Sequence, residues 1–205
     1  MNGDEFLWQR IVVALSGLIY WGGVVVQARR VRKRIGRTPN LKPKDAKERL
    51  LWIGWTVVIL CWILQPLWVR GTGRWYDISA ALVHPLAWIV GTALMVVGYA
   101  ATLWCYAAMG TAWRIGIDER GTSRLVQVGP YRCIRHPIYG FQMTMLLGAA
   151  FLLPTWISLA ILVIHYLCAS IKAADEERHL TGVFGEEYRD LMRKTGRFLP
   201  KIGGR

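Results

Sequence analysis

The part of the chain richest in reactive side chains is residues 129–140, GPYRCIRHPIYG, which lies between two long apolar regions. It brings Arg135, His136 and Tyr139 close together, and its two prolines prevent one uninterrupted helix. Irregular polar backbone beside a bilayer is tolerated where it is buried in protein or lines a cavity. The segment therefore predicts a site. The alternative is an ordinary loop whose arginines anchor to lipid phosphates.

A second polar group, Glu176-Glu177, follows about forty residues later and precedes a tail rich in aromatic and basic residues. Adjacent glutamates on a helix point about 100° apart. One of them, with Glu177 favoured, is therefore expected to face a ligand, while the other pairs with a cation such as Arg178 or Arg114. A solvated acidic turn is the alternative.

Together the two groups resemble the superfamily of isoprenylcysteine carboxyl methyltransferases and phospholipid methyltransferases. The resemblance covers residues 110–200 and rests on two patterns, RHPxY and a later EE-xx-L-xxx-FG-xx-Y. The residues that carry it are Leu125, Val126, Gly129, Pro130, Tyr131, Arg135, His136, Pro137, Tyr139, Glu176, Glu177, Leu180, Phe184, Gly185 and Tyr188.

The resemblance implies an integral membrane methyltransferase that binds S-adenosyl-L-methionine (SAM) between its last helices and the loops beside them. Arginine suits a carboxylate, a glutamate suits ribose hydroxyls or an ammonium group, and an aromatic face suits a sulfonium. We expect Arg135, Glu177 and Arg114 to be catalytic. The residues expected to bind SAM are Leu125, Val126, Gly129, Tyr131, His136, Pro137, Tyr139, Glu176 and Glu177.

One position departs from the pattern of the superfamily. Its members often carry glycine two residues after the motif tyrosine, whereas this chain has Gly140 directly after Tyr139 and Phe141 next. The cofactor contacts just after Tyr139 are accordingly in doubt.

Several functions remain open at this stage. We expect carboxyl O-methylation of an isoprenylcysteine-like lipid, with N-methylation of an aminophospholipid or O-methylation of a phenolic lipid as alternatives. A small transporter is the alternative of another class, although only His165 and Gln65 are strongly polar deep within apolar runs. No gly-rich dinucleotide loop follows a strand, which excludes a soluble Rossmann-type methyltransferase.

The composition predicts an all-α polytopic membrane protein. The 205 residues are 54% hydrophobic and include 11 tryptophans. This makeup is unusual for a soluble domain. We expect a single domain over residues 1–205, with three N-terminal spans in residues 1–109 and the cofactor-binding and catalytic region in residues 110–205. The four cysteines show no paired spacing, so neither a disulfide nor a metal site is expected.

About five transmembrane helices can be placed along the chain. Three are expected at residues 7–27, 50–69 and 82–109. The next apolar stretch, residues 141–171, would be about 46 Å long as one helix, which exceeds a hydrocarbon core of about 30 Å. A hairpin that turns at Pro154 fits better. Residues 175–199 then predict an amphipathic helix at the cytoplasmic interface.

The basic residues predict how the chain is oriented in the membrane. The formal net charge is +13, and ten, five and eight of the 26 basic residues lie in residues 29–49, 114–135 and 172–205. The positive-inside rule places these segments in the cytoplasm, with the N-terminus outside and the active site inside. We expect a multi-pass protein, with no cleavable signal peptide, in the bacterial inner membrane. Its partners would be bilayer lipids and a lipophilic substrate, without nucleic acid or an obligate protein partner.

Overall fold

The computed structural model describes residues 6–36, 38–39, 43, 45–69, 83–113 and 125–201. The polar loop expected between the second and third spans lies outside these residues. Within them the fold is all-α, as the sequence predicts. The six helices are α1 (Leu7–Ile35), α2 (Ala46–Leu64), α3 (Pro85–Met109), α4 (Pro137–Leu152), α5 (Trp156–Phe184) and α6 (Glu186–Lys194).

Five of these helices form a bundle that confirms the expected membrane segments. Four are long and apolar enough to cross a bilayer, and α4 is a shorter apolar helix. Large apolar side chains such as Ile53, Ile89 and Val96 are exposed on the outside of the bundle. Such a surface is stable when lipid surrounds it, so the chain is an integral multi-pass membrane protein.

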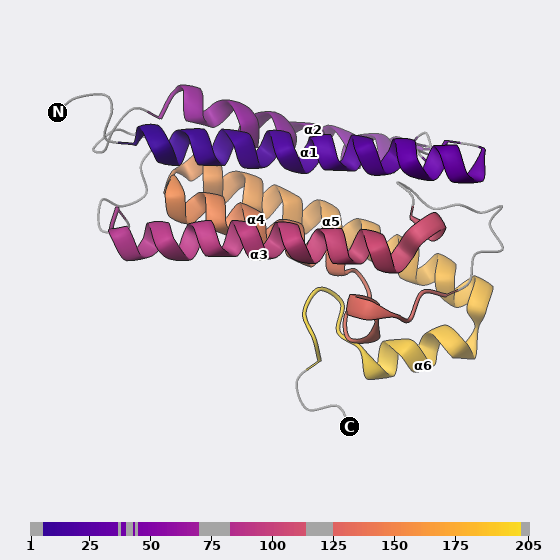
Figure 1. The fold of residues 1–205 in the computed structure, drawn as a ribbon. Helices are drawn as coiled ribbons and strands as arrows, with labels where there is room; N and C mark the ends of the chain where they lie inside the picture. Colours follow the sequence, from indigo (N-terminus) through magenta and orange to yellow (C-terminus); the bar gives the residue numbers. More distant parts are fainter. Residues whose placement is uncertain are drawn as a thin grey trace.

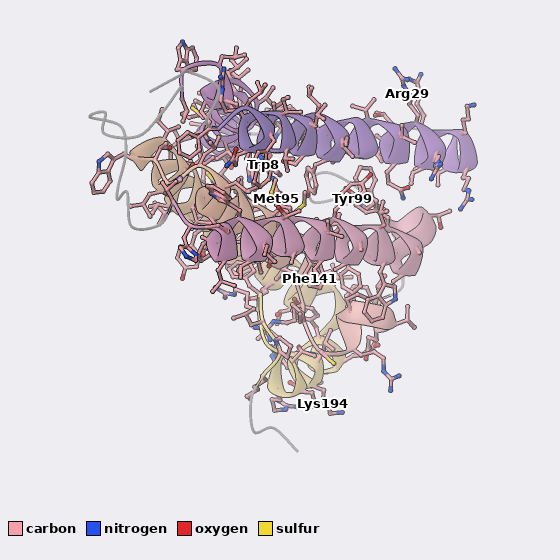
Figure 2. The ribbon with its side chains drawn as sticks, turned by 60° about the vertical axis from the view of Figure 1, so that its left-hand side comes forward. Trp8, Arg29, Met95, Tyr99, Phe141 and Lys194 are labelled. Carbon is pink, nitrogen blue, oxygen red and sulfur yellow. The ribbon has the colours of Figure 1, made fainter. Side chains whose placement is uncertain are left out.

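The bundle has two layers (Figure 1). Helices α1 and α2 run side by side along one layer, and α3, α4 and α5 form the other. Figure 2 shows Met95 and Tyr99 projecting from α3 toward α1, whereas Arg29 projects from α1 on its far side. The core between the layers includes Val13, Val58, Met145 and Ile161. We call the end of the bundle that carries residues 129–136 the motif end.

The hairpin expected at Pro154 is confirmed. Helix α4 ends at Leu152, and α5 begins at Trp156 after a buried three-residue turn. The side chain of Thr155 caps α5, because its Oγ1 accepts a hydrogen bond of 3.1 Å from the backbone N–H of Ser158. The chain therefore returns to the motif end, where the tail begins.

The bounds expected for the interfacial helix are wrong. Residues 175–184 continue α5 through Gly182, and the helix ends at Gly185, whose φ of 56° favours glycine. The separate helix α6 is only nine residues long. It folds back below the motif end of the bundle, where Lys194 marks its last turn (Figures 1 and 2).

Glycines allow α3 and α4 to approach closely. A Cβ atom on Gly91 would lie 2.8 Å from the carbonyl oxygen of Gly148, and one on Gly98 would lie 2.8 Å from that of Phe141. Small residues at such positions let helix backbones meet in a membrane. The interface fixes the start of α4, and with it Tyr139, relative to α3.

Candidate functional site

Two prolines shape the RHPxY segment. Pro130 lies in the first turn of the 3-10 helix η4 (Gly129–Arg132), and Pro137 begins α4. Proline suits both positions because it needs no N–H partner there. Gly129 has φ 57°, and a Cβ on it would lie 3.2 Å from Cβ of Ala108 in α3. The segment thus turns tightly against α3 and leaves Arg135 and His136 at the bundle end.

The C-terminal segment, residues 195–201, docks along the motif. Arg135 N donates to the carbonyl of Gly196 and His136 N to that of Arg197, each at 2.9 Å. A Cβ on Gly140 would clash with the carbonyl oxygen of Phe198. The glycine directly after Tyr139 therefore has a structural reason, since it makes room for this segment.

Glu177 lies at the centre of a buried ion-pair cluster. Its Oε1 accepts a hydrogen bond of 2.8 Å from Nε of Arg135, and its other oxygen pairs with Arg197. The Glu177 side chain is only 9% exposed. Arg135 also donates through Nη1 to the carbonyl of Thr195. Arg135 thus joins α5 to the C-terminal segment.

Glu176 is held differently and is more accessible. Its Oε1 accepts a hydrogen bond of 3.1 Å from the hydroxyl of Tyr139, and its Oε2 lies 3.2 Å from Nδ1 of His136. Its side chain is 23% exposed. Arg135 and Arg197 both pair with its neighbour Glu177 instead. Glu176 is therefore the carboxylate of the pair that is better placed to meet a ligand.

His136 sits between the two carboxylates. Burial lowers its pKa, but its interactions with Glu176 and Glu177 outweigh burial, so the pKa lies above the ordinary value of 6.5. The ring stacks on Tyr139 with centroids 5.9 Å apart and planes at 16°. Tyr139 in turn stacks on Trp55 of α2, at 6.0 Å and 24°. Three rings thus form a row that leads from α2 to the carboxylates.

Among the described residues of this region, two buried polar atoms have no hydrogen-bond partner. One is Nε2 of His136, whose nearest carboxylate oxygen, on Glu177, is 3.5 Å away and too distant for a good hydrogen bond. The other is the hydroxyl of Tyr188, whose pKa is raised by burial and by the charge of Glu177. Unpaired buried groups are destabilising, so they point to a polar ligand.

A comparison with protein families identifies the domain. The model of the phospholipid methyltransferase family matches residues 86–187. The chain belongs to the membrane methyltransferase superfamily. The matched residues include α3, the RHPxY motif, the hairpin and both glutamates. Membership suggests a lipid methyltransferase, and methyltransferases of this family use SAM.

Two curated relatives are named as metal-resistance proteins and not as methyltransferases. The chain is 29% identical over 150 residues to the nickel-cobalt-cadmium resistance protein NccN of Alcaligenes xylosoxydans xylosoxydans, covering 72% of this chain and 63% of that protein. It is 26% identical over 151 residues to the cobalt-zinc-cadmium resistance protein CzcN of Cupriavidus metallidurans, covering 73% and 64%. The chain thus spans just under two thirds of the length of these relatives.

The methyltransferase motifs bring most of the predicted site residues together. Arg135, His136, Tyr139, Glu176 and Glu177 meet at the motif end, as described above. Of the remaining predicted residues, Leu125 and Val126 are half-buried, Pro137 and Tyr131 are buried, and Gly129 packs closely on α3; no hydrogen bond or ion pair joins them to the two glutamates in the described part of the chain.

Arg178 and Arg114 were the two cations expected to pair with one of the glutamates. The expectation for Arg178 is wrong. Arg178 pairs with Asp175, because three residues on an exposed helix face bring these two together, and it meets neither glutamate. Arg114 lies outside the described residues. The cations that do pair with Glu177 are Arg135 and Arg197.

Sequence reasoning missed three contributors to this candidate site. Arg197 and Thr195 belong to a segment that was expected to be helical, and Trp55 lies in an apolar span far from the motif. The only local signal is Gly196, which interrupts the helical pattern before Arg197. His165 lies deeper, where its Nε2 is 3.1 Å from the carbonyl oxygen of Tyr139 and joins α5 to α4.

Proposed function

We propose that the chain transfers a methyl group from SAM to a lipophilic acceptor that reaches the motif end from the bilayer. The observation that carries the proposal is the accessible carboxylate of Glu176, fixed by Tyr139 and His136 at the end of an apolar bundle. Family membership supports the reaction type. A fixed carboxylate with aromatic neighbours fits a ligand that carries both hydroxyl and cationic groups.

The residues at the motif end fit SAM by their chemistry. SAM supplies an electrophilic methyl group on a sulfonium centre. Glu176 would hold its ribose hydroxyls or its ammonium group, and the unpaired atoms of His136 and Tyr188 would meet further polar groups. Arg197 also pairs with Glu177, but its side chain is 41% exposed, so its remaining N–H donors would bind the carboxylate of SAM.

Arg135 takes a different part in this proposal from the one that the sequence suggested. Its guanidinium is engaged with Glu177 and Thr195, so it orders the site instead of holding the substrate. Glu177 likewise neutralises two arginines. Alignment of the reactants accounts for much of the rate of a transfer reaction, so residues that order the site matter for turnover.

The acceptor is proposed to be a phospholipid carrying an amine, because the family model is that of phospholipid methyltransferases. Carboxyl O-methylation of an isoprenylcysteine-like lipid and O-methylation of a phenolic lipid are the two alternatives. The motif end is proposed to face the cytoplasm of a bacterial inner membrane, because most of the basic residues flank it.

The names of the relatives raise a second role, in metal resistance. Across the described part of the chain, no group of three or more His, Cys, Asp or Glu residues could hold a metal ion. We propose that a contribution to resistance would act through a modified lipid. Growth on cadmium of cells carrying the wild type or Glu176→Gln would test it: equal growth would exclude this role.

The proposed reaction can be tested with purified protein in detergent. Calorimetric titration with SAM should give saturable binding that Glu176→Gln weakens, and labelled methyl groups should appear in membrane lipid extracts. Separate assays with an aminophospholipid, a prenylated cysteine and a phenolic lipid would identify the methylated atom. A protein that is folded by its thermal transition but does not bind SAM would contradict the proposal and favour the transporter.

A further inference from the structure

Helix α2 lies outside the residues that match the family model, yet it touches the candidate site at two places. The first is Trp55, whose ring stacks on Tyr139 at 6.0 Å. Tyr139 is the residue whose hydroxyl donates to Glu176. The Tyr139 ring is thus stacked both with Trp55 of α2 and with His136.

The second place is a pair of ion pairs between the start of α2 and α5. Nζ of Lys47 lies 2.6 Å from Asp175, and Nζ of Lys172 lies 2.9 Å from Glu48. The Lys172 and Glu48 side chains are 7% and 18% exposed. Burial makes this pair sensitive to the loss of either partner. In one pair α2 contributes the cation and in the other it contributes the anion. A shift of α2 along α5 would bring like charges together, so the two pairs favour a single register.

These contacts lie close to Glu176 along the helices. Lys172 precedes Glu176 by one helical turn and therefore shares its side of α5. Glu48 precedes Trp55 by two turns, which places both on one side of α2. The ion pairs thus fix the position of Trp55 along α2 relative to the Tyr139 ring. The position of the Tyr139 ring in turn fixes its hydroxyl beside Glu176.

We propose that Trp55 is a positioning residue of the SAM site, acting through Tyr139, and that the two ion pairs hold α2 in the register that this requires. The inference rests on the proposed function, because it assumes that Glu176 binds SAM. Removal of the indole exposes one face of the Tyr139 ring, which can then turn away from Glu176. Glu176 loses a fixed donor and becomes less well ordered for the cofactor.

A double-mutant cycle tests whether Trp55 acts through Tyr139. Trp55→Ala and Tyr139→Phe are each expected to weaken SAM binding about tenfold, and the double variant should bind no more weakly than Tyr139→Phe. Trp52→Ala is the matched control, because Trp52 lies on the same helix with 44% exposure. It should bind SAM as the wild type does. Trp55→Phe keeps a stacking ring and should retain most of the affinity.

The outcomes separate the two proposals. Additive losses, near a hundredfold in the double variant, would show that Trp55 does not act through Tyr139, and unchanged binding by Trp55→Ala would overturn the inference alone. A wild-type protein that does not bind SAM overturns the proposed function as well.

The ion pairs provide a second test in case Trp55→Ala does not fold. Glu48→Lys and Lys172→Glu should each weaken SAM binding, and combining them should restore it by re-forming the pair with exchanged charges. Failure of the combined variant to regain SAM affinity, in protein that is folded by its thermal transition, would contradict the proposed register.

Discussion

Replacement of Arg135 by lysine tests the role of the buried cluster. Arg135 uses Nε to bind Glu177 at 2.8 Å and Nη1 to bind the carbonyl of Thr195. A lysine ammonium is a single point charge and can take the place of only one of these donors. The Arg135→Lys variant therefore keeps its charge but loses one of the two arginine contacts that join α5 to the C-terminal segment; the pair of Arg197 with Glu177 remains.

The expected loss follows from the bond that is broken. A hydrogen bond to a charged group contributes about 1.5 to 3 kcal/mol. For a chain of this size, each kcal/mol lowers the thermal midpoint by about 2 to 4 °C, so a decrease of about 3 to 12 °C is expected. Arg135 orders Glu177 and directly precedes His136, which contacts Glu176. Methyl transfer should therefore fall roughly ten- to a hundredfold, at about 1.4 kcal/mol per tenfold.

Arg132→Lys supplies the matched control for this experiment. Arg132 is three residues earlier in the same segment and is exposed, so its stability change should stay within about 0.5 kcal/mol. Thermal scans in detergent, SAM titration and labelled-methyl transfer should be run on both variants and the wild type. Equal stability and activity of the two variants would refute the reasoning, because the buried Arg135 guanidinium would then matter no more than the exposed Arg132.

Three further results are expected. Glu177→Gln should destabilise the fold by about 3 to 5 kcal/mol by leaving the buried Arg135 guanidinium without its carboxylate partner, whereas Glu176→Gln should keep the thermal midpoint and weaken SAM binding about tenfold. His136 binds its proton more tightly in the folded state, because its pKa there is raised above the ordinary value. Its contribution to stability is therefore complete below about pH 6.5 and is lost as the pH rises through the raised pKa. Thermal midpoints measured across this range should decline in the wild type, and the decline should be absent in His136→Gln. Gly140→Ala should displace the C-terminal segment and expose it to limited proteolysis, while Gly182→Ala, where a Cβ meets nothing within 4 Å, should not.

The sequence was sufficient for the bundle because hydrophobic length determines spans in a membrane. Residues 141–171 were too long for one crossing and contained Pro154, which together led to the correct hairpin. The end of α5 was harder to predict, because the amphipathic pattern begins at residue 175 without any break in the helix. Periodicity shows which side of a helix is apolar but not whether two helical segments are continuous.

The site was predicted only where its residues lie in short motifs. Arg135, Tyr139 and the two glutamates could be found because each belongs to a pattern of neighbouring residues. The pairing of Glu177 with Arg197, and the stacking of Trp55 on Tyr139, join segments whose contact depends on how the whole chain folds. No local pattern encodes such contacts, so the roles of individual residues could not be assigned from the sequence.

The glycine contacts between α3 and α4 also restrict how the bundle can move. With carbonyl oxygens of one helix less than 3 Å from where side chains of the other would begin, the two backbones leave no room for a hydrocarbon chain between them. Helices α3 and α4 should therefore move as one rigid body. A lipid acceptor is expected to enter where α1 can shift against this pair, and a crosslink between α3 and α4 would leave its entry undisturbed.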